Sequence, residues 1–123
     1  KKLKNLYLRE KDKKQLDKDG HMIGLHSHSH PNLIEKLNFK NQLKEYKLNK
    51  AILEKLLKKK IYSMSHPSGS YNSQTLKILK KLGIIIGFKQ IMIKDRNMKK
   101  INNTNFEIAR ANHSEIIRRH RII

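Results

Sequence analysis

Short apolar segments alternate with helical patterns along the middle of this chain, and this alternation restricts its fold more than any other feature. The apolar segments 22–27, 61–65 and 84–88 are each short enough to be a single strand. The stretches between them, 33–60 and 72–83, have helical patterns. Strands joined by helical crossovers of this length pair in parallel. We therefore expect an α/β protein with parallel strands and flanking helices.

The longer helical stretch, residues 33–60, is interrupted near residues 38–41 and is clearest after that break. Its most regular apolar positions, Leu48, Ile52 and Leu56, are spaced four residues apart, which is the spacing of one helix face. The stripe is widened by Ala51, Leu53 and Leu57. The lysines of the stretch lie mostly off that stripe. We expect the stripe to pack against the protein and the lysines to face solvent.

The second helix has clear signals at both ends. Asn72 or Ser73 is a suitable N-cap, and Gly83 is a good residue to follow the last turn. The positions expected to point inward are leucines: Leu76, Leu79 and Leu82. The next residues, 84–88, form a continuous apolar run, as expected for a strand buried on both faces.

The two ends of the chain are more polar. Residues 1–19 suit a short surface helix that runs into a turn at Asp19-Gly20. Toward the carboxyl end, residues 106–108 suit a last strand and residues 114–120 a closing helix. With 123 residues the chain is one domain at most, spanning residues 1–123.

Positive charge is the strongest feature of the composition. The chain carries 29 lysines and arginines against 10 acidic residues, a net charge of +19. Such a surface attracts phosphates, so a basic nucleic-acid or polyanion-binding protein is the alternative function to weigh. The lysines are, however, spread along every segment, with few aromatic residues between them to stack on bases. We therefore do not expect nucleic acid to be the partner.

The composition also excludes several classes of protein. The absence of cysteine rules out disulfides and thiolate zinc sites. No apolar run is long enough to span a membrane. Residues 1–5 lack the apolar stretch of a signal peptide. The compartment stays open, with the cytoplasm favoured.

Three histidines at alternate positions, His26, His28 and His30, form the most unusual cluster in the sequence. Neutral imidazoles are good ligands for Zn²⁺ and similar cations. An extended segment would place all three on one face, whereas a helical one would bring His26 and His30 together and turn His28 away. Two imidazoles alone hold a metal weakly, because catalytic zinc normally has three protein ligands. A hydrogen-bonded surface cluster is the simpler alternative.

A second unusual loop, residues 66–71, follows the predicted strand at 61–65. Like the histidine loop at 26–31, it comes at the carboxyl end of its strand. The carboxyl ends of parallel strands meet at one edge of a sheet, where α/β proteins gather their chemistry. We expect the two loops to open on the same rim.

The segment from Gly20 to Pro31, GHMIGLHSHSHP, resembles the second motif of the NodB-type polysaccharide deacetylases. That motif runs glycine, histidine, glutamate, isoleucine, glycine, one variable residue, histidine, serine or threonine, two variable residues and histidine, often with proline. Residues 65–72, SHPSGSYN, resemble the third motif, in which proline, an aromatic residue and glycine precede a tyrosine-asparagine helix start. The resemblance covers most of residues 15–90, in the family's order.

The resemblance implies a distorted (β/α) barrel, here a partial one, and metal-dependent hydrolysis of the acetamide of an N-acetylated sugar or polysaccharide. It implies that His26 and His30 hold a divalent metal, with zinc favoured, and that His28 fills a variable position. Residues of the 66–71 loop would line the sugar site: Pro67, Ser68, Gly69 and Tyr71.

The sequence departs from the family's pattern in three places. No consecutive aspartates precede residue 20, although in the family such a pair supplies the general base and a third metal ligand. Ser65 stands where members have arginine, and Ser68 where they have an aromatic residue. The late motif that supplies the acid is not recognisable; His113 is the nearest candidate for the catalytic acid, followed by His120.

Two origins fit these departures. The chain is either the carboxyl-terminal two-thirds of a deacetylase domain or a degenerate member that has lost catalysis, and its polar start favours the first. We expect little or no activity from these residues alone. Because a barrel without its first strands exposes a sheet edge, we also expect partial instability or self-association.

Overall fold

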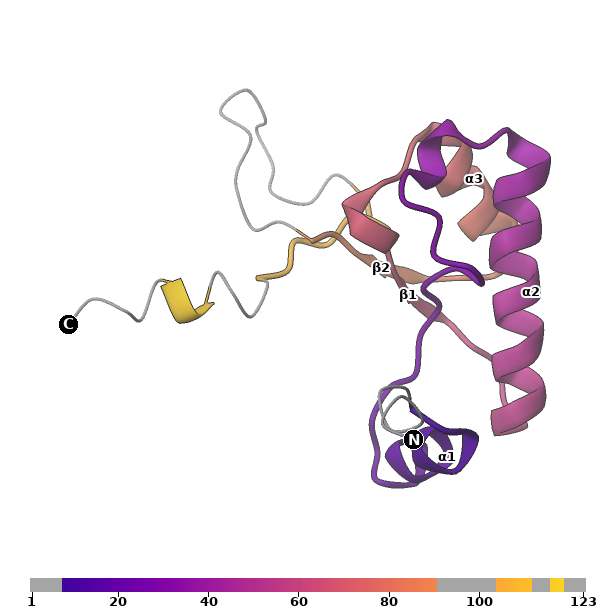
Figure 1. Ribbon diagram of the computed structural model, residues 1–123, viewed down its shortest axis with the longest axis vertical. Helices are drawn as coiled ribbons and strands as arrows, with labels where there is room; N and C mark the ends of the chain where they lie inside the picture. Colours follow the sequence, from indigo (N-terminus) through magenta and orange to yellow (C-terminus); the bar gives the residue numbers. More distant parts are fainter. Residues whose placement is uncertain (1–7, 91–103, 112–115, 119–123) are drawn as a thin grey trace, which may run out of the picture.

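A computed structural model describes residues 8–90, 104–111 and 116–118 (Figure 1). In chain order the elements are α1 (Glu10–Lys18), the 3-10 turn η2 (Ile34–Lys36), α2 (Phe39–Leu57), β1 (Ser63–Ser65), the 3-10 turn η3 (Pro67–Gly69), α3 (Ser73–Lys81) and β2 (Ile86–Phe88). Of the helix predicted at 114–120, residues 116–118 are helical and the others lie outside the described residues.

The strands confirm the prediction of a parallel α/β sheet. β1 pairs with β2 in parallel, with Ser63 opposite Ile86. Two single parallel bridges extend this sheet, one from Leu25 to Met64 and one from Phe88 to Ile108. Four segments therefore lie side by side in the order in which they occur in the chain, which is the arrangement of a (β/α) barrel.

The two outer segments pair over less of their length than predicted. Leu25 makes both backbone bonds of its bridge, its N–H donating to the Ser63 carbonyl over 2.9 Å and its carbonyl accepting from the Ser65 N–H over 2.9 Å. Two residues later the chain turns, because Ser27 has a positive φ of 61°. The predicted strand at 22–27 is thus one bridge followed by a loop.

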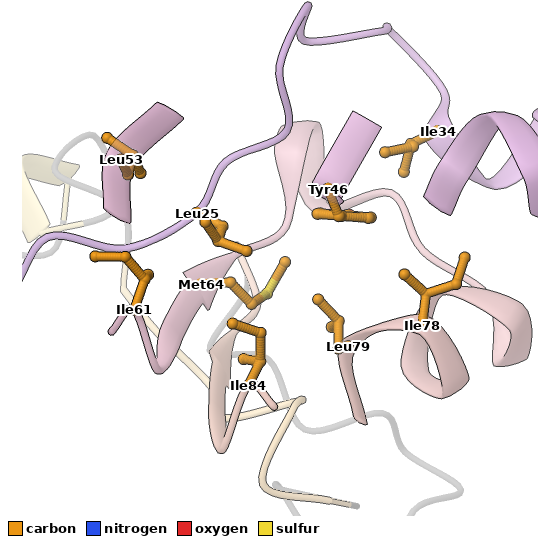
Figure 2. Close-up of a cluster of buried hydrophobic side chains, with 9 residues drawn as sticks. All are labelled: Leu25, Ile34, Tyr46, Leu53, Ile61, Met64, Ile78, Leu79 and Ile84. Carbon is orange, nitrogen blue, oxygen red and sulfur yellow. The ribbon is translucent and has the colours of Figure 1, made fainter. Parts of the chain in front are cut away.

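The core lies between the sheet and the helices α2 and α3, which cover the same face in Figure 1. Figure 2 shows its side chains pointing toward one another from these elements. The buried members are Leu25, Ile34, Tyr46, Leu53, Ile61, Met64, Ile78, Leu79 and Ile84. Burying nine large apolar side chains of this kind contributes roughly 1.5–3 kcal/mol each before the entropy cost of ordering the chain.

The prediction for the packing face of α2 is right only in part. Leu53 is buried and Leu57 packs partly buried against the core, but Leu48 is 39% exposed and Ile52 44% exposed. The residues that α2 buries are Gln42, Tyr46 and Leu53. The buried face is therefore rotated from the predicted stripe toward Gln42 and Tyr46. The sequence pattern did not indicate this rotation, because glutamine and tyrosine carry no strong apolar signal.

Gln42 can be buried because both ends of its amide are hydrogen-bonded. Its Nε2 donates to the Leu37 carbonyl over 2.8 Å, and its Oε1 accepts from the Thr75 hydroxyl over 2.6 Å. Thr75 lies on α3, so this pair joins the two helices inside the core. Satisfying a buried amide in this way avoids the desolvation cost of an unpaired polar group.

The prediction that residues 84–88 are buried on both faces is wrong. Ile84 is 2% exposed, but the neighbouring Ile85 is 62% exposed. In the described part of the chain the helices cover one face of the sheet only (Figure 1). The apolar run at 84–88 is therefore not buried along its whole length.

The end signals of α3 are confirmed. The Asn72 side chain accepts from the backbone N–H groups of Gln74 and Thr75, which makes it the N-cap. Gly83 follows the helix with a positive φ of 73°, a conformation that suits glycine. Leu79 is buried, and the other two predicted leucines pack partly buried against the core.

The predicted surface helix is α1, which buries none of its residues. It ends at a turn in which Gly20 has a positive φ of 87°. It contacts α2, and its Asp17 forms an ion pair with Lys59, which follows the carboxyl-terminal end of α2. None of the helices in the described residues combines the length and the apolar character needed to cross a lipid bilayer.

Candidate functional site

The two unusual loops meet at the carboxyl end of the sheet, as predicted. The Nδ1 atom of His26, in the first loop, lies 2.8 Å from the backbone oxygen of Ser65, which ends β1. The Ser70 hydroxyl, in the second loop, donates to the Glu35 carboxylate just beyond the first. The Asn72 amide also donates to the Glu35 carbonyl over 2.8 Å.

His26 and His30 converge within the first loop. Their ring centroids are 4.9 Å apart and their planes are inclined by 56°. The loop is neither extended nor helical, because Ser27 and His30 have positive φ angles of 61° and 54°. It nevertheless brings together the two histidines that the helical alternative paired, while His28 is exposed between them.

The His26 ring has one fixed nitrogen and one available nitrogen. A carbonyl oxygen can only accept, so the bond to Ser65 places the ring proton on Nδ1. When the ring is neutral, Nε2 carries the lone pair. A histidine whose other nitrogen donates to a backbone carbonyl in this way is the usual form of a metal-ligating imidazole.

Glu45 on α2 holds the histidine loop through its carboxylate. Its carboxylate accepts from the His28 backbone N–H over 3.0 Å, the Ser29 backbone N–H over 2.8 Å and the Ser29 hydroxyl over 2.8 Å. Burial by itself would raise the pKa of Glu45, but these hydrogen bonds outweigh it and hold the pKa below its ordinary value. The loop is thus pinned to the helix by a charged acceptor.

Two further contacts fix the histidine backbone. The His26 N–H donates to the Asn49 side-chain oxygen over 3.0 Å, one helical turn after Glu45. The His30 N–H donates to the Ser27 hydroxyl over 3.2 Å, and Ser27 is buried. The convergence of His26 and His30 therefore rests on contacts made by the loop's own backbone.

His66 lies on the same rim but in a different environment. It is 1% exposed, its Nε2 lies 2.8 Å from the Phe106 carbonyl, and its ring stacks on Tyr71 with centroids 4.2 Å apart. Its Nδ1 is buried and has no hydrogen-bond partner among the described residues. Burial lowers the pKa of His66, and this outweighs the opposing effects of the Phe106 carbonyl and of Glu107.

A buried acid completes this side of the rim. The Tyr71 hydroxyl donates to Glu107 over 2.9 Å, and the Thr104 hydroxyl donates to the other carboxylate oxygen over 2.8 Å. Burial, together with the hydrogen bond to Glu107, raises the pKa of Tyr71 to about 12. The phenol is therefore a protonated donor throughout the physiological pH range.

A sequence model of the polysaccharide deacetylase family matches residues 5–86. The chain belongs to the polysaccharide deacetylase family. The match includes both unusual loops and ends in β2. No curated protein sequence is significantly similar to the chain.

Solved deacetylase structures have the same fold. The Streptococcus pyogenes deacetylase PplD, solved in complex with acetate, superposes with a TM-score of 0.75 at 23% identity, over 94% of this chain and 52% of that one. The BpsB deacetylase domain of Bordetella bronchiseptica gives 0.70 at 13% identity, over 87% and 49%. A CE4 family pseudoenzyme from Bacillus anthracis gives 0.58 at 21% identity, over 61% and 26%. The chain thus spans about half the length of the first two structures.

The ligands expected of this deacetylase-family site are present only in part. In the described ranges, no three histidine, aspartate or glutamate side chains gather closely enough to hold a metal ion. His26 and His30 supply two imidazoles. The predicted acid candidates His113 and His120 lie outside the described residues.

The four residues predicted to line the sugar site differ in accessibility. Pro67 is buried, Gly69 and Tyr71 are half-buried, and Ser68 is exposed. The loop turns sharply at Ser68 and Gly69, which have positive φ angles of 52° and 69°. Ser68 is therefore the member of the four that presents its side chain to solvent.

A hollow of about 580 Å³ adjoins His26 and the strand β1. Its lining includes the hydroxyl-bearing Ser63 and Ser65, the apolar Met22 and Phe88, and the His26 ring. It is large enough for a small ligand. It places the His26 ring at the edge of a concave surface.

Sequence reasoning missed three acidic or basic residues of this region: Glu45, His66 and Glu107. Each acts through a contact with a distant part of the chain, such as the 40-residue separation between His66 and Phe106. Glu45 lies in a lysine-rich helix and resembles any surface acid in sequence. His66 alone carried a signal, since it directly precedes Pro67 in the third motif.

Proposed function

We propose that this chain forms part of a metal-dependent deacetylase that removes acetyl groups from N-acetylated sugars, with His26 and His30 as imidazole ligands of a divalent cation, zinc being favoured. The observation that carries the proposal is the convergence of these two rings at 4.9 Å on the rim where the third-motif loop also lies. Family membership supplies the reaction class.

The residues present suit part of such a metal site. Imidazole nitrogens are common ligands of zinc, and the Ser65 carbonyl fixes the His26 tautomer that leaves Nε2 free. Two imidazoles do not complete a catalytic site, which normally has three protein ligands. The remaining ligand and the general base would then come from outside the described residues.

Each part of the rim has a role in this proposal. A bound divalent cation would polarise the acetamide carbonyl and make water a better nucleophile. His26 and His30 hold the cation, and Glu45 keeps their loop in place. The loop of Pro67, Ser68, Gly69 and Tyr71 lines the sugar site, with Ser68 exposed to the substrate.

We further propose that the chain supplies the carboxyl-terminal two-thirds of a deacetylase domain. The chain covers 52% and 49% of two deacetylase structures, which supports a chain that forms only part of such a domain. The described residues hold two ligands rather than three, so we expect little or no activity from these 123 residues alone. Robust release of acetate from chitooligosaccharides by this chain would contradict that expectation.

Isothermal titration with Zn²⁺ and Co²⁺ tests the metal site directly. We expect His26→Ala and His30→Ala each to weaken binding by about tenfold or more, since loss of one of two imidazoles removes half of the ligand set. His28→Ala is the matched control, because His28 belongs to the same exposed loop and should leave binding unchanged. Equal losses for all three variants would point to nonspecific binding by a histidine-rich loop and would overturn the assignment.

A further inference from the structure

The most regular apolar stripe of the chain lies outside the core. Leu48 and Ile52 are 39% and 44% exposed on the outer side of α2, and Leu56, one turn further, is half-buried. Single exposed apolar residues are ordinary on protein surfaces. Here three apolar residues spaced four positions apart form a row along one helix face, and a partner helix can contact such a row.

This stripe runs into a groove between α1 and the end of α2. One hollow of about 310 Å³ is lined by Ile52 and Leu56 of α2, with Glu10 and Lys14 of α1. A second hollow of about 260 Å³ shares Lys14 and Leu56 with the first. We call the two together the α1–α2 groove. Its floor is apolar and continuous with the exposed stripe, and Figure 1 shows α1 beside the lower end of α2.

The walls of the α1–α2 groove are positively charged. The lysines that line its two hollows are Lys14, Lys18, Lys55 and Lys58. The acidic residues that line them are Glu10 and Asp17, and Asp17 is already paired with Lys59. The groove therefore has an excess of positive charge around an apolar floor.

We propose that the α1–α2 groove and the adjoining stripe dock an acidic amphipathic helix of a partner polypeptide. Its apolar residues, spaced every third or fourth position, would cover Leu48, Ile52 and Leu56, and its carboxylates would meet Lys14 and Lys55. The groove lies at the carboxyl-terminal end of α2, from Ile52 onward, whereas the histidine loop contacts α2 earlier, at Glu45 and Asn49.

Other occupants suit this surface less well. A second copy of the chain would bring another net charge of +19 against the lysine walls. Nucleic acid would meet the lysines but would gain nothing from the aliphatic floor, since the lining contains no aromatic residue for bases to stack on. An anionic polysaccharide would likewise leave the stripe uncovered.

Fluorescence anisotropy with a synthetic peptide tests the proposal. The probe is a helix of about 18 residues, long enough to be stable in part, with leucines on one face and glutamates on the other. The comparison peptide has the same composition in a shuffled order that places no two leucines on one face. We expect the patterned peptide to bind at least about tenfold more tightly than the shuffled one.

Paired variants separate the stripe from general charge. Ile52→Ser should weaken binding of the patterned peptide by about tenfold, while Ile85→Ser, which changes a more exposed isoleucine beside β2, should not. Lys14→Gln with Lys55→Gln should weaken binding more than Lys40→Gln with Lys77→Gln, a change of equal net charge at other exposed sites. Equal binding of the two peptides, or binding of the patterned peptide that is as tight with Ile52→Ser as without it, would overturn the proposal.

Discussion

His26 and His66 lie on the same rim and use the same device to fix their rings, yet their free nitrogens have opposite surroundings. Each ring has one nitrogen 2.8 Å from a backbone carbonyl, Ser65 for His26 and Phe106 for His66. The other nitrogen of His26 belongs to an exposed ring beside His30, whereas that of His66 is buried and has no hydrogen-bond partner within the described part of the chain. An imidazole can bind an incoming ion when its second nitrogen is accessible, and this difference supports the proposed ligand role of His26 and a structural role for His66.

Replacing one histidine on each side of the rim by alanine, His66 or His30, should give the largest difference in the free energy of unfolding. His66→Ala removes a fully buried ring, its stacking on Tyr71 and its hydrogen bond, so we expect the free energy of unfolding to fall by about 3 kcal/mol. His30→Ala removes an exposed ring and should change it by less than about 0.5 kcal/mol. Urea unfolding followed by circular dichroism measures both. Similar losses for the two variants would mean that the exposed ring is structural as well.

Glu45→Gln should disturb the histidine loop and spare the His66 side. Glutamine keeps one acceptor oxygen but loses the charge, so the three bonds from His28 and Ser29 weaken, and we expect a loss of about 1.5–2 kcal/mol in unfolding free energy. Because the pKa of Glu45 is lowered in the folded chain, this stabilisation is full above the ordinary carboxyl pKa and is lost as the pH falls through the lowered value.

The same variant should weaken Zn²⁺ binding, because His30 would no longer be held beside His26. Glu10→Gln is a suitable control, since it also removes one carboxylate from an exposed helix position. Zinc affinity that stays unchanged in Glu45→Gln would separate the loop anchor from the metal site and would leave the convergence of the rings without this support.

The two sides of the rim also differ in how far the sequence predicts them. The alternation of apolar and helical segments gave the parallel sheet, and the shared rim followed because carboxyl ends of parallel strands meet. The second-motif resemblance singled out His26 and His30, and the structure brings their rings together. The loop conformation was not predictable, because it depends on the positive φ of Ser27 and on Glu45, which lies 16 residues after Ser29.

The His66 side was harder to predict, and so was the face of α2. Glu107 and Phe106 contact Tyr71 and His66 across sequence separations of 36 and 40 residues, so these contacts depend on the tertiary fold. The α2 prediction missed Gln42 and Tyr46 for a related reason. Burial of Gln42 depends on its hydrogen bond from Thr75 of α3, a tertiary contact that the sequence of α2 does not indicate.

The smallest expected effect is a dependence of stability on pH that belongs to His66. Burial, the main cause, lowers its pKa below the ordinary value of 6.5; the Phe106 carbonyl and Glu107 oppose this, and His26 adds to it. The unfolded chain therefore binds a proton at a higher pH than the folded chain does. The contribution is fully present above about pH 6.5 and declines as the pH falls from there through the lowered folded pKa.

One proton sets the upper limit of this slope, about 1.4 kcal/mol per pH unit. Urea unfolding at several pH values between about 7.5 and 5 measures it, and His66→Gln isolates it, because glutamine does not titrate while the other histidines are common to both proteins. We expect the pH dependence of the original chain to be the steeper of the two. Equal slopes would mean that the ring takes up its proton as easily in the folded chain as in the unfolded one. Its second nitrogen would then have to be accessible, and the distinction drawn between His66 and His26 would no longer hold.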